Sequence, residues 1–135
     1  MRIAVDFDGT IVEHKFPKIG NPVPDAIEWC RRFQALGAKL ILWTMRSDNE
    51  SDKFLTEAVD YCGKFGLVFD AVNEGLDDRA WTTSPKAYAN VYIDDAAYGC
   101  PLIRCDRSDP ARRPYVDWSV VGPAIEARIL AGGGF

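Results

Sequence analysis

Apolar, strand-like segments alternate with helix-like segments along most of this chain, and no other feature of the sequence limits the fold as strongly. Strands are expected over five short ranges: 2–7, 39–44, 67–72, 90–94 and 102–104. Apolar residues recur at helical spacing over three ranges: 25–37, 54–62 and 117–130. This order predicts an α/β fold with a mostly parallel central sheet and helices on both faces, a three-layer Rossmann-like arrangement.

Turn and cap residues mark the ends of these elements. Gly37 suits the C-terminal cap of the first helix, and the polar cluster at 47–51 can cap the second. The second helix is expected to stop near 63–66, where glycines recur. Gly122 and Pro123 must either interrupt the start of the last helix or mark its true beginning.

The length indicates a single domain. The 135 residues fall within the usual range for one core, and neither a repeat nor a linker divides them. We expect the domain to span 1–131, with 132–135 as a disordered tail. Segment 10–20 is expected to be a loop or a small hairpin, and segment 73–85 is expected to be irregular. Four aromatic residues are expected in or near the core: Trp29, Trp81, Tyr92 and Trp118.

The composition argues against two classes of partner. The formal charge is −4 and the pI about 4.9, which disfavours nonspecific binding of nucleic acid. No apolar run approaches the length of a membrane helix, and charge enters too early for a signal peptide, so a cytoplasmic location without a membrane partner is expected. No Cys-x-x-Cys pair is present, so the four cysteines are expected to be free thiols: Cys30, Cys62, Cys100 and Cys105.

Acidic residues follow two of the expected strands. Asp6 and Asp8 stand at the end of the first, and Asp94 and Asp95 at the end of the fourth. Ligands of parallel α/β sheets bind at the carboxyl ends of the strands, so these side chains are expected to meet. Carboxylates so close together repel unless a cation compensates, and oxygen ligands beside a phosphate favour Mg²⁺.

A Mg²⁺ ion beside these carboxylates would suit a site for phosphoryl transfer. Asp6 and Asp8 are two residues apart, so both side chains lean to the same side of an extended chain. One can attack phosphorus while the other protonates the leaving oxygen. Gly9 lets the backbone approach the phosphate and turn away. A hydroxyl from Thr44 and a charge from Lys86 would help to neutralise the phosphoryl oxygens.

The segment Asp6-Phe7-Asp8-Gly9-Thr10 after an apolar strand resembles the first motif of the haloacid dehalogenase superfamily. Leu40–Thr44 resembles its second motif, Lys86 its third and Val91–Asp95 its fourth, in the same order across 1–95. Members with an aspartate two residues after the nucleophile are mainly phosphatases and phosphotransferases. Asp8 therefore argues against a dehalogenase or an ATPase pump.

The resemblance implies a reaction and a set of site residues. Asp6 would become an aspartyl-phosphate, and Asp8 would act as general acid and then as general base. Mg²⁺ would be ligated by the Asp6 carboxylate, the Asp8 backbone carbonyl and one carboxylate of Asp94 and Asp95, with Asp95 favoured as the direct ligand. Thr44 would bind phosphoryl oxygens. The implied substrate-binding residues are Phe7, Gly9, Thr44, Met45, Arg46 and Lys86.

The gaps between motifs leave no room for a cap domain. Only 33 positions separate Thr10 from Thr44, and 41 separate Thr44 from Lys86. A single catalytic domain without a cap has an open site, which suits a bulky or macromolecular phosphoester, or a lid from another subunit of a homo-oligomer.

Several alternatives remain open at this level. The phosphohydrolase would act on a small-molecule or exposed phosphomonoester, and a nucleotidase or a polynucleotide-end phosphatase would be narrower forms of it. A phosphate- or metal-binding module without turnover is a different class, and a Ca²⁺ or structural-metal site is a third. Arg46 could reach a phosphate or cap a helix. Other charged residues either flank the substrate or belong to solvated surface: Glu13, His14, Lys15, Lys18 and Arg104–Arg113.

Overall fold

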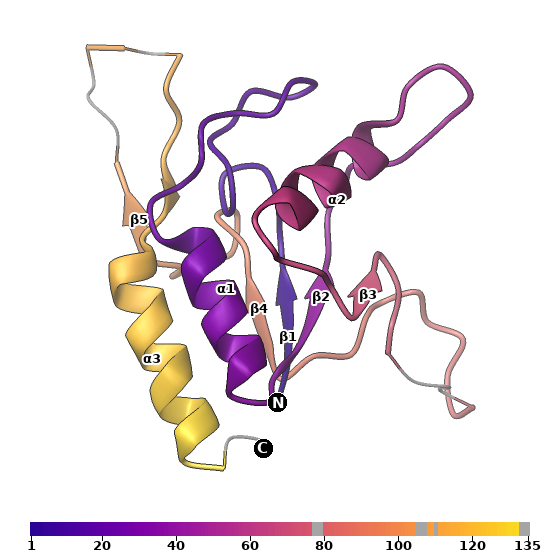
Figure 1. Ribbon diagram of the computed structural model, residues 1–135, viewed down its shortest axis with the longest axis vertical. Coiled ribbons are helices and arrows are strands. Elements are labelled where there is room, and N and C mark those ends of the chain that lie inside the picture. The colour runs from indigo at the N-terminus through magenta and orange to yellow at the C-terminus, as the bar shows by residue number, and fades with distance from the viewer. Residues whose placement is uncertain (77–79, 105–107, 110, 133–135) are drawn as a thin grey trace.

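The protein is described by a computed structural model that covers residues 1–76, 80–104, 108–109 and 111–132. Its main sheet has four parallel strands. In spatial order they are β3 (Ala71–Val72), β2 (Lys39–Leu42), β1 (Arg2–Val5) and β4 (Val91–Ile93). Figure 1 shows β1 between β2 and β4, with the helices beside them. The expected α/β class with a parallel sheet is confirmed.

The strands are shorter than the apolar runs that predict them. In β3, pairing with β2 begins only at Ala71, although the apolar run begins at Leu67. At the preceding position, the Asp70 side chain accepts the Leu40 N–H at 2.8 Å. A side-chain carboxylate therefore satisfies a backbone donor just before the strand begins.

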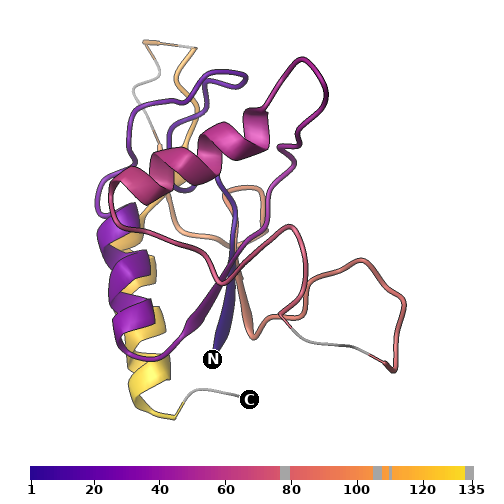
Figure 2. The same ribbon diagram turned by 45° about the vertical axis from the view of Figure 1, so that its right-hand side comes forward.

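All three helices pack on one face of the sheet. They are α1 (Ala26–Ala35), α2 (Phe54–Lys64) and α3 (Trp118–Leu130). Their buried side chains share one core cluster with Ile3 and Val5, which alternate along β1 with Ala4. Figure 2 shows the helices together on one side and the β3–β4 connection on the other.

The opposite face of the sheet has a thinner cover. Ala4 and Ile41 contact Ala87 and Ala89, which come from the irregular segment before β4. The expectation of helices on both faces is not confirmed, because the described part of the β3–β4 connection contains no helix. This stretch is the polar segment at 73–85, which has no helical spacing of apolar residues.

Two short strands form a separate antiparallel pair. They are β5 (Leu102–Ile103), where a strand is expected, and β6 (Tyr115–Val116), which the sequence does not predict. Helix α3 follows β6 directly, and the Asp117 side chain accepts the Ser119 N–H at its N-terminus. The helix runs through Pro123 without interruption, so neither expectation for Gly122 and Pro123 holds.

Cap and core predictions have mixed outcomes. Gly37 has a φ of +97° just after α1, as a C-terminal cap residue does. Asp48, from the predicted polar cluster, accepts the Leu55 N–H and the Thr56 N–H in the first turn of α2. Trp118 is buried, but the core placement of Trp81 is wrong, since that side chain is 83% exposed.

No described helix combines the length and apolar composition that crossing a membrane requires. Cys30, Cys62 and Cys100 are free thiols, as expected. Cys105 and most of the predicted tail, 133–135, lie outside the described residues.

Candidate active site

Three carboxylates converge where β1 and β4 end. The parallel register pairs Val5 with Ile93, so the residues that follow them, Asp6 and Asp94, emerge side by side. The Asp6 N–H extends the pairing by donating to the Ile93 carbonyl at 2.9 Å. One carboxylate oxygen from each of Asp6, Asp94 and Asp95 lies within 4.8 Å of the other two. The predicted meeting is therefore confirmed for Asp6, Asp94 and Asp95, whereas the Asp8 carboxylate is not part of this cluster.

The electrostatics of this cluster favour a bound cation. Burial, together with the negative charges of Asp94 and Asp95, raises the pKa of Asp6 from 3.8 to about 8. A cation among the three would remove this repulsion. Three carboxylates supply the hard oxygen ligands that Mg²⁺ prefers, so the donor set fits this ion. Ca²⁺ prefers the same type of ligand atom, so the donor set fits Ca²⁺ as well.

A tight turn after β1 holds the cluster together. The Phe7 carbonyl accepts the N–H groups of Thr10, Ile11 and Val12 at 2.8–3.2 Å. Gly9 has a φ of +83°, which favours glycine, and a Cβ there would lie 2.5 Å from Asp95 Oδ2. The turn therefore requires glycine for its backbone angle and for space beside the carboxylate.

Thr10 is a site residue to which the sequence assigned no role. Its side chain is fully buried, and its hydroxyl donates to Asp6 Oδ2 at 3.4 Å. The Thr10 hydroxyl oxygen in turn accepts the Asp95 N–H at 3.3 Å. Thr10 thus links the end of β1 to the end of β4 and fixes the separation of the two carboxylates.

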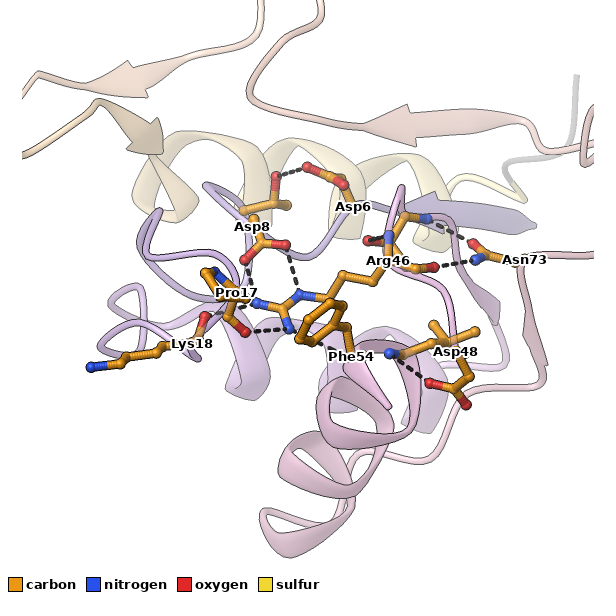
Figure 3. A network of polar contacts seen from close by, with 11 residues as sticks. Asp6, Asp8, Pro17, Lys18, Arg46, Asp48, Phe54 and Asn73 are labelled. Atoms are coloured by element: carbon orange, nitrogen blue, oxygen red, sulfur yellow. Dashed lines mark hydrogen bonds and ion pairs between the residues drawn. The ribbon is translucent and has the colours of Figure 1, made fainter. Parts of the chain in front are cut away.

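Asp8 is paired with Arg46. The Arg46 Nε and Nη2 each lie 2.8 Å from a different oxygen of the Asp8 carboxylate, as Figure 3 shows. This two-point contact is the strong form of ion pair that arginine makes with a carboxylate. Both carboxylate oxygens of Asp8 are therefore occupied by a side chain from the loop after β2.

The pairing changes the expected role of Arg46. The residue is 2% exposed and does not line the cavity beside Asp6, so it cannot reach a substrate phosphate from this position. Its Nη2 also donates to the Lys18 carbonyl at 2.8 Å, and its guanidinium lies 5.0 Å from the Phe7 ring centre and 5.2 Å from that of Phe16. Arg46 is a buried structural link rather than a substrate-binding group. Phe7 is fully buried as well and does not line the cavity, so its side chain belongs to the core rather than to a substrate-binding surface.

The loop after β2 is fixed by Asn73, a residue without a predicted role. The Asn73 side chain accepts the Thr44 N–H at 2.8 Å and donates to the Arg46 carbonyl at 3.1 Å. Asn73 follows β3 with a φ of +52°, a conformation that asparagine tolerates. Its amide therefore continues the sheet's hydrogen bonding past the end of β3 and sets the position of Thr44.

A cavity of about 310 Å³ opens beside Asp6. The residues that line it are Asp6, Trp43, Thr44, Met45, Asn73 and Asp94. Thr44 is thus brought to the nucleophile candidate, as expected, and Met45 stands at the rim with its side chain 96% exposed. A phosphoryl group could be held between Asp6 and Thr44 with the rest of the ligand in this cavity.

Lys86 lies apart from this cavity. Its side chain is exposed and does not line the cavity, and its Nζ lies 5.2 Å above the Tyr92 ring centre. The expectation that the charge of Lys86 helps to neutralise the phosphoryl oxygens remains a prediction.

His14 joins the site from the loop after the first motif. Its Nε2 lies 2.7 Å from Asp95 Oδ2, and a Cβ on Gly9 would lie 2.1 Å from the same nitrogen. The residue pattern alone did not distinguish this arrangement from a solvated loop. Its neighbour Glu13 pairs with Arg112 at 3.0 Å, which agrees with the salt-bridged surface expected of that basic segment. Lys15 and Lys18 are exposed, and their described hydrogen bonds are made by the main chain: the Lys18 N–H donates to the Lys15 carbonyl at 3.0 Å, and the Lys18 carbonyl accepts Arg46 Nη2.

Comparisons with known proteins add a family relationship. No protein-family model matches the chain, and no curated protein does. Among solved structures, the chain is similar to a conserved protein from Bacteroides thetaiotaomicron, with 34% sequence identity and a TM-score of 0.75. The similarity covers 95% of this chain and 91% of that chain. The chain therefore belongs to the same protein family as this conserved Bacteroides thetaiotaomicron protein.

Proposed function

We propose that this chain is a Mg²⁺-dependent phosphohydrolase of the haloacid dehalogenase type, without a cap domain, that hydrolyses a phosphomonoester through an aspartyl-phosphate on Asp6. The observation that carries the proposal is the cluster of Asp6, Asp94 and Asp95 at the ends of neighbouring parallel strands, beside a cavity that also contains Thr44. In this proposal the fold is a reduced Rossmann-like form of that superfamily, with one helical layer.

The metal would be held by carboxylate oxygens of Asp6 and of Asp94 or Asp95, together with the Asp8 backbone carbonyl. A bound Mg²⁺ would stabilise negative charge on the phosphoryl oxygens. The raised pKa of Asp6 without a cation supports this assignment, because Asp6 must be a carboxylate to act as a nucleophile.

The chain's own residues would carry the two steps. In the first, an Asp6 oxygen forms a bond to phosphorus while the bond to the leaving oxygen breaks, and that oxygen takes a proton from Asp8. In the second, Asp8 accepts a proton from water as the water oxygen attacks phosphorus, which releases inorganic phosphate and restores the Asp6 carboxylate. Thr44 would donate to a phosphoryl oxygen in both.

The Arg46 pairing matters for the role of Asp8. In the paired form both Asp8 oxygens accept hydrogen bonds from Arg46, and in this proposal Asp8 is the proton acceptor of the second step. To donate a proton in the first step, Asp8 must release at least one of its two hydrogen bonds to Arg46. The pairing of Asp8 with Arg46 is therefore the observation that favours the alternative function, a phosphate- or metal-binding module without turnover.

One experiment separates the two functions. The purified protein is assayed for hydrolysis of p-nitrophenyl phosphate with Mg²⁺ and with EDTA, alongside Asp6→Asn and the exposed control Asp60→Asn on α2. The phosphohydrolase predicts Mg²⁺-dependent turnover that Asp6→Asn abolishes and Asp60→Asn retains. Absence of turnover by the wild type, with phosphate binding retained, would instead support the binding module.

A further inference from the structure

The cavity beside Asp6 has an apolar wall formed by consecutive residues. Trp43, Thr44 and Met45 follow the end of β2, and all three line the cavity with Asp6. The Trp43 N–H donates to the Val5 carbonyl at 2.8 Å, which anchors this wall to β1. Trp43 is only partly buried, and Met45 is 96% exposed. Two large apolar side chains are therefore available to a ligand whose phosphoryl group lies at Asp6.

The other polar groups of the cavity are already engaged within the protein. The Asn73 amide is bonded on both sides, to the Thr44 N–H and to the Arg46 carbonyl. The Thr44 hydroxyl oxygen accepts the Arg46 N–H at 3.1 Å, and Asp94 Oδ1 accepts the Ala96 N–H at 2.8 Å. A leaving group rich in hydroxyls would lose water here and find few new partners, which is unfavourable.

The position of Trp43 in the fold leaves this wall open. Trp43 packs beside Ala4 and Ile41, on the sheet face that no described helix covers. The cover of that face comes from Ala87, Ala89 and the partly buried Leu76, all from the irregular segment between β3 and β4. A ligand group can therefore lie along the Trp43 side chain without displacing a helix.

From this arrangement we propose that the substrates are phosphomonoesters of alcohols that carry a planar aromatic group, and that this group binds against Trp43 and Met45. This inference rests on the proposed phosphohydrolase function. In-line attack by Asp6 directs the leaving oxygen away from the nucleophile, toward the outer part of the cavity. An aromatic ring there gains stacking on the indole of Trp43 and contact with the thioether of Met45.

The test compares two esters whose leaving oxygens are chemically alike. Both 2-(1-naphthyl)ethyl phosphate and ribose 5-phosphate are monoesters of primary alcohols, so a difference between them reflects binding of the rest of the molecule. We expect kcat/KM of the wild type to favour the naphthyl ester by about tenfold, the size of one good aromatic contact with its area burial. Trp43→Leu and Met45→Ser should each reduce this ratio by roughly threefold or more, mainly through KM of the naphthyl ester.

A matched control and a second variant keep the test decisive. Trp81→Leu removes a tryptophan that is 83% exposed and outside the cavity, so it should leave the ratio unchanged. Met45→Ser changes an almost fully exposed side chain, so it tests the wall even if Trp43→Leu fails to fold. A wild type that turns over both esters equally, or variants that keep the full ratio, would overturn the inference. Absence of turnover on any phosphomonoester would overturn the proposed function instead.

Discussion

Arg46 and Asp8 form a buried two-point ion pair, with two N···O distances of 2.8 Å, between the loop after β2 and the turn after β1. The guanidinium also bonds the carbonyls of Pro17, Lys18 and Phe54 at 2.8–3.4 Å. One side chain thus joins the first motif, the loop that follows it and the start of α2. The pair gives the site a rigid side next to the open cavity.

Loss of the Asp8 charge should therefore destabilise the fold more than loss of the Asp6 charge. Asp8→Asn leaves a buried guanidinium without its counter-charge, which should lower the free energy of unfolding by about 3–5 kcal/mol. Asp6→Asn is the matched control two residues away, and it removes repulsion rather than a partner. Urea unfolding of the metal-free proteins measures both. Equal loss of stability in the two variants would contradict a structural role for the pair.

Much of the fold could be predicted because it depends on short patterns. The apolar runs at 39–44 and 90–94 contain β2 and β4, and acidic residues just after β1 and β4 meet because parallel strands end at one edge. The two-residue β6 gives no periodicity to detect. The sequence of a single helix also does not indicate on which face of the sheet it packs, because one apolar stripe allows packing on either face.

The connections within the site could not be predicted for a related reason. Asp8 and Arg46 are 38 positions apart, and His14 and Asp95 are 81 positions apart. Each contact depends on the path of a loop with no regular pattern, so the residue types alone left Arg46 free to bind a phosphate or cap a helix. The contact between Asn73 and Thr44 could not be predicted either, because the identity of a polar residue after a strand does not indicate its hydrogen-bond partner.

The stability of the metal-free protein should fall as the pH rises between about 4 and about 8. The pKa of Asp6 is raised by burial and by Asp94 and Asp95 to about 8 in the folded protein, against 3.8 for its ordinary value. Between these values the folded protein keeps a proton that the unfolded chain has released, so the free energy of unfolding decreases with pH. Below pH 4 both states hold the proton, and this contribution is constant.

Comparison with Asp6→Asn isolates this contribution. The variant has no proton to release at this position, so its stability should decline less over the same window. Urea unfolding of both proteins in EDTA at pH 5, 6, 7 and 8 gives the two slopes. Parallel slopes would show that Asp6 is not the group responsible.

Magnesium should stabilise the wild type by binding the folded state. A ligand that binds only the folded protein raises the midpoint of thermal unfolding in proportion to its saturation. Asp94→Asn and Asp95→Asn should each reduce the shift that Mg²⁺ produces, and the variant with the smaller remaining shift identifies the direct ligand. Asp60→Asn, an exposed carboxylate on α2, controls for loss of a negative charge elsewhere. An equal shift in all four proteins would place the ion outside the carboxylate cluster.

Two helical glycines should respond to alanine in opposite directions. Gly63 lies in α2, and a Cβ there would meet no atom within 4 Å. Gly63→Ala should therefore raise the free energy of unfolding by about 0.5–1 kcal/mol, because alanine restricts the unfolded chain and favours the helix.

Gly122 lies in α3, where a Cβ would come within 2.2 Å of the Trp29 ring on α1. The same gain in helix propensity is then outweighed by overpacking, which costs about 1–3 kcal/mol when neighbours must shift. Gly122→Ala should thus lower the stability, as measured by urea unfolding beside Gly63→Ala. The contrast tests the close packing of α1 and α3, because two glycines in a loosely packed helical layer would both gain stability from alanine.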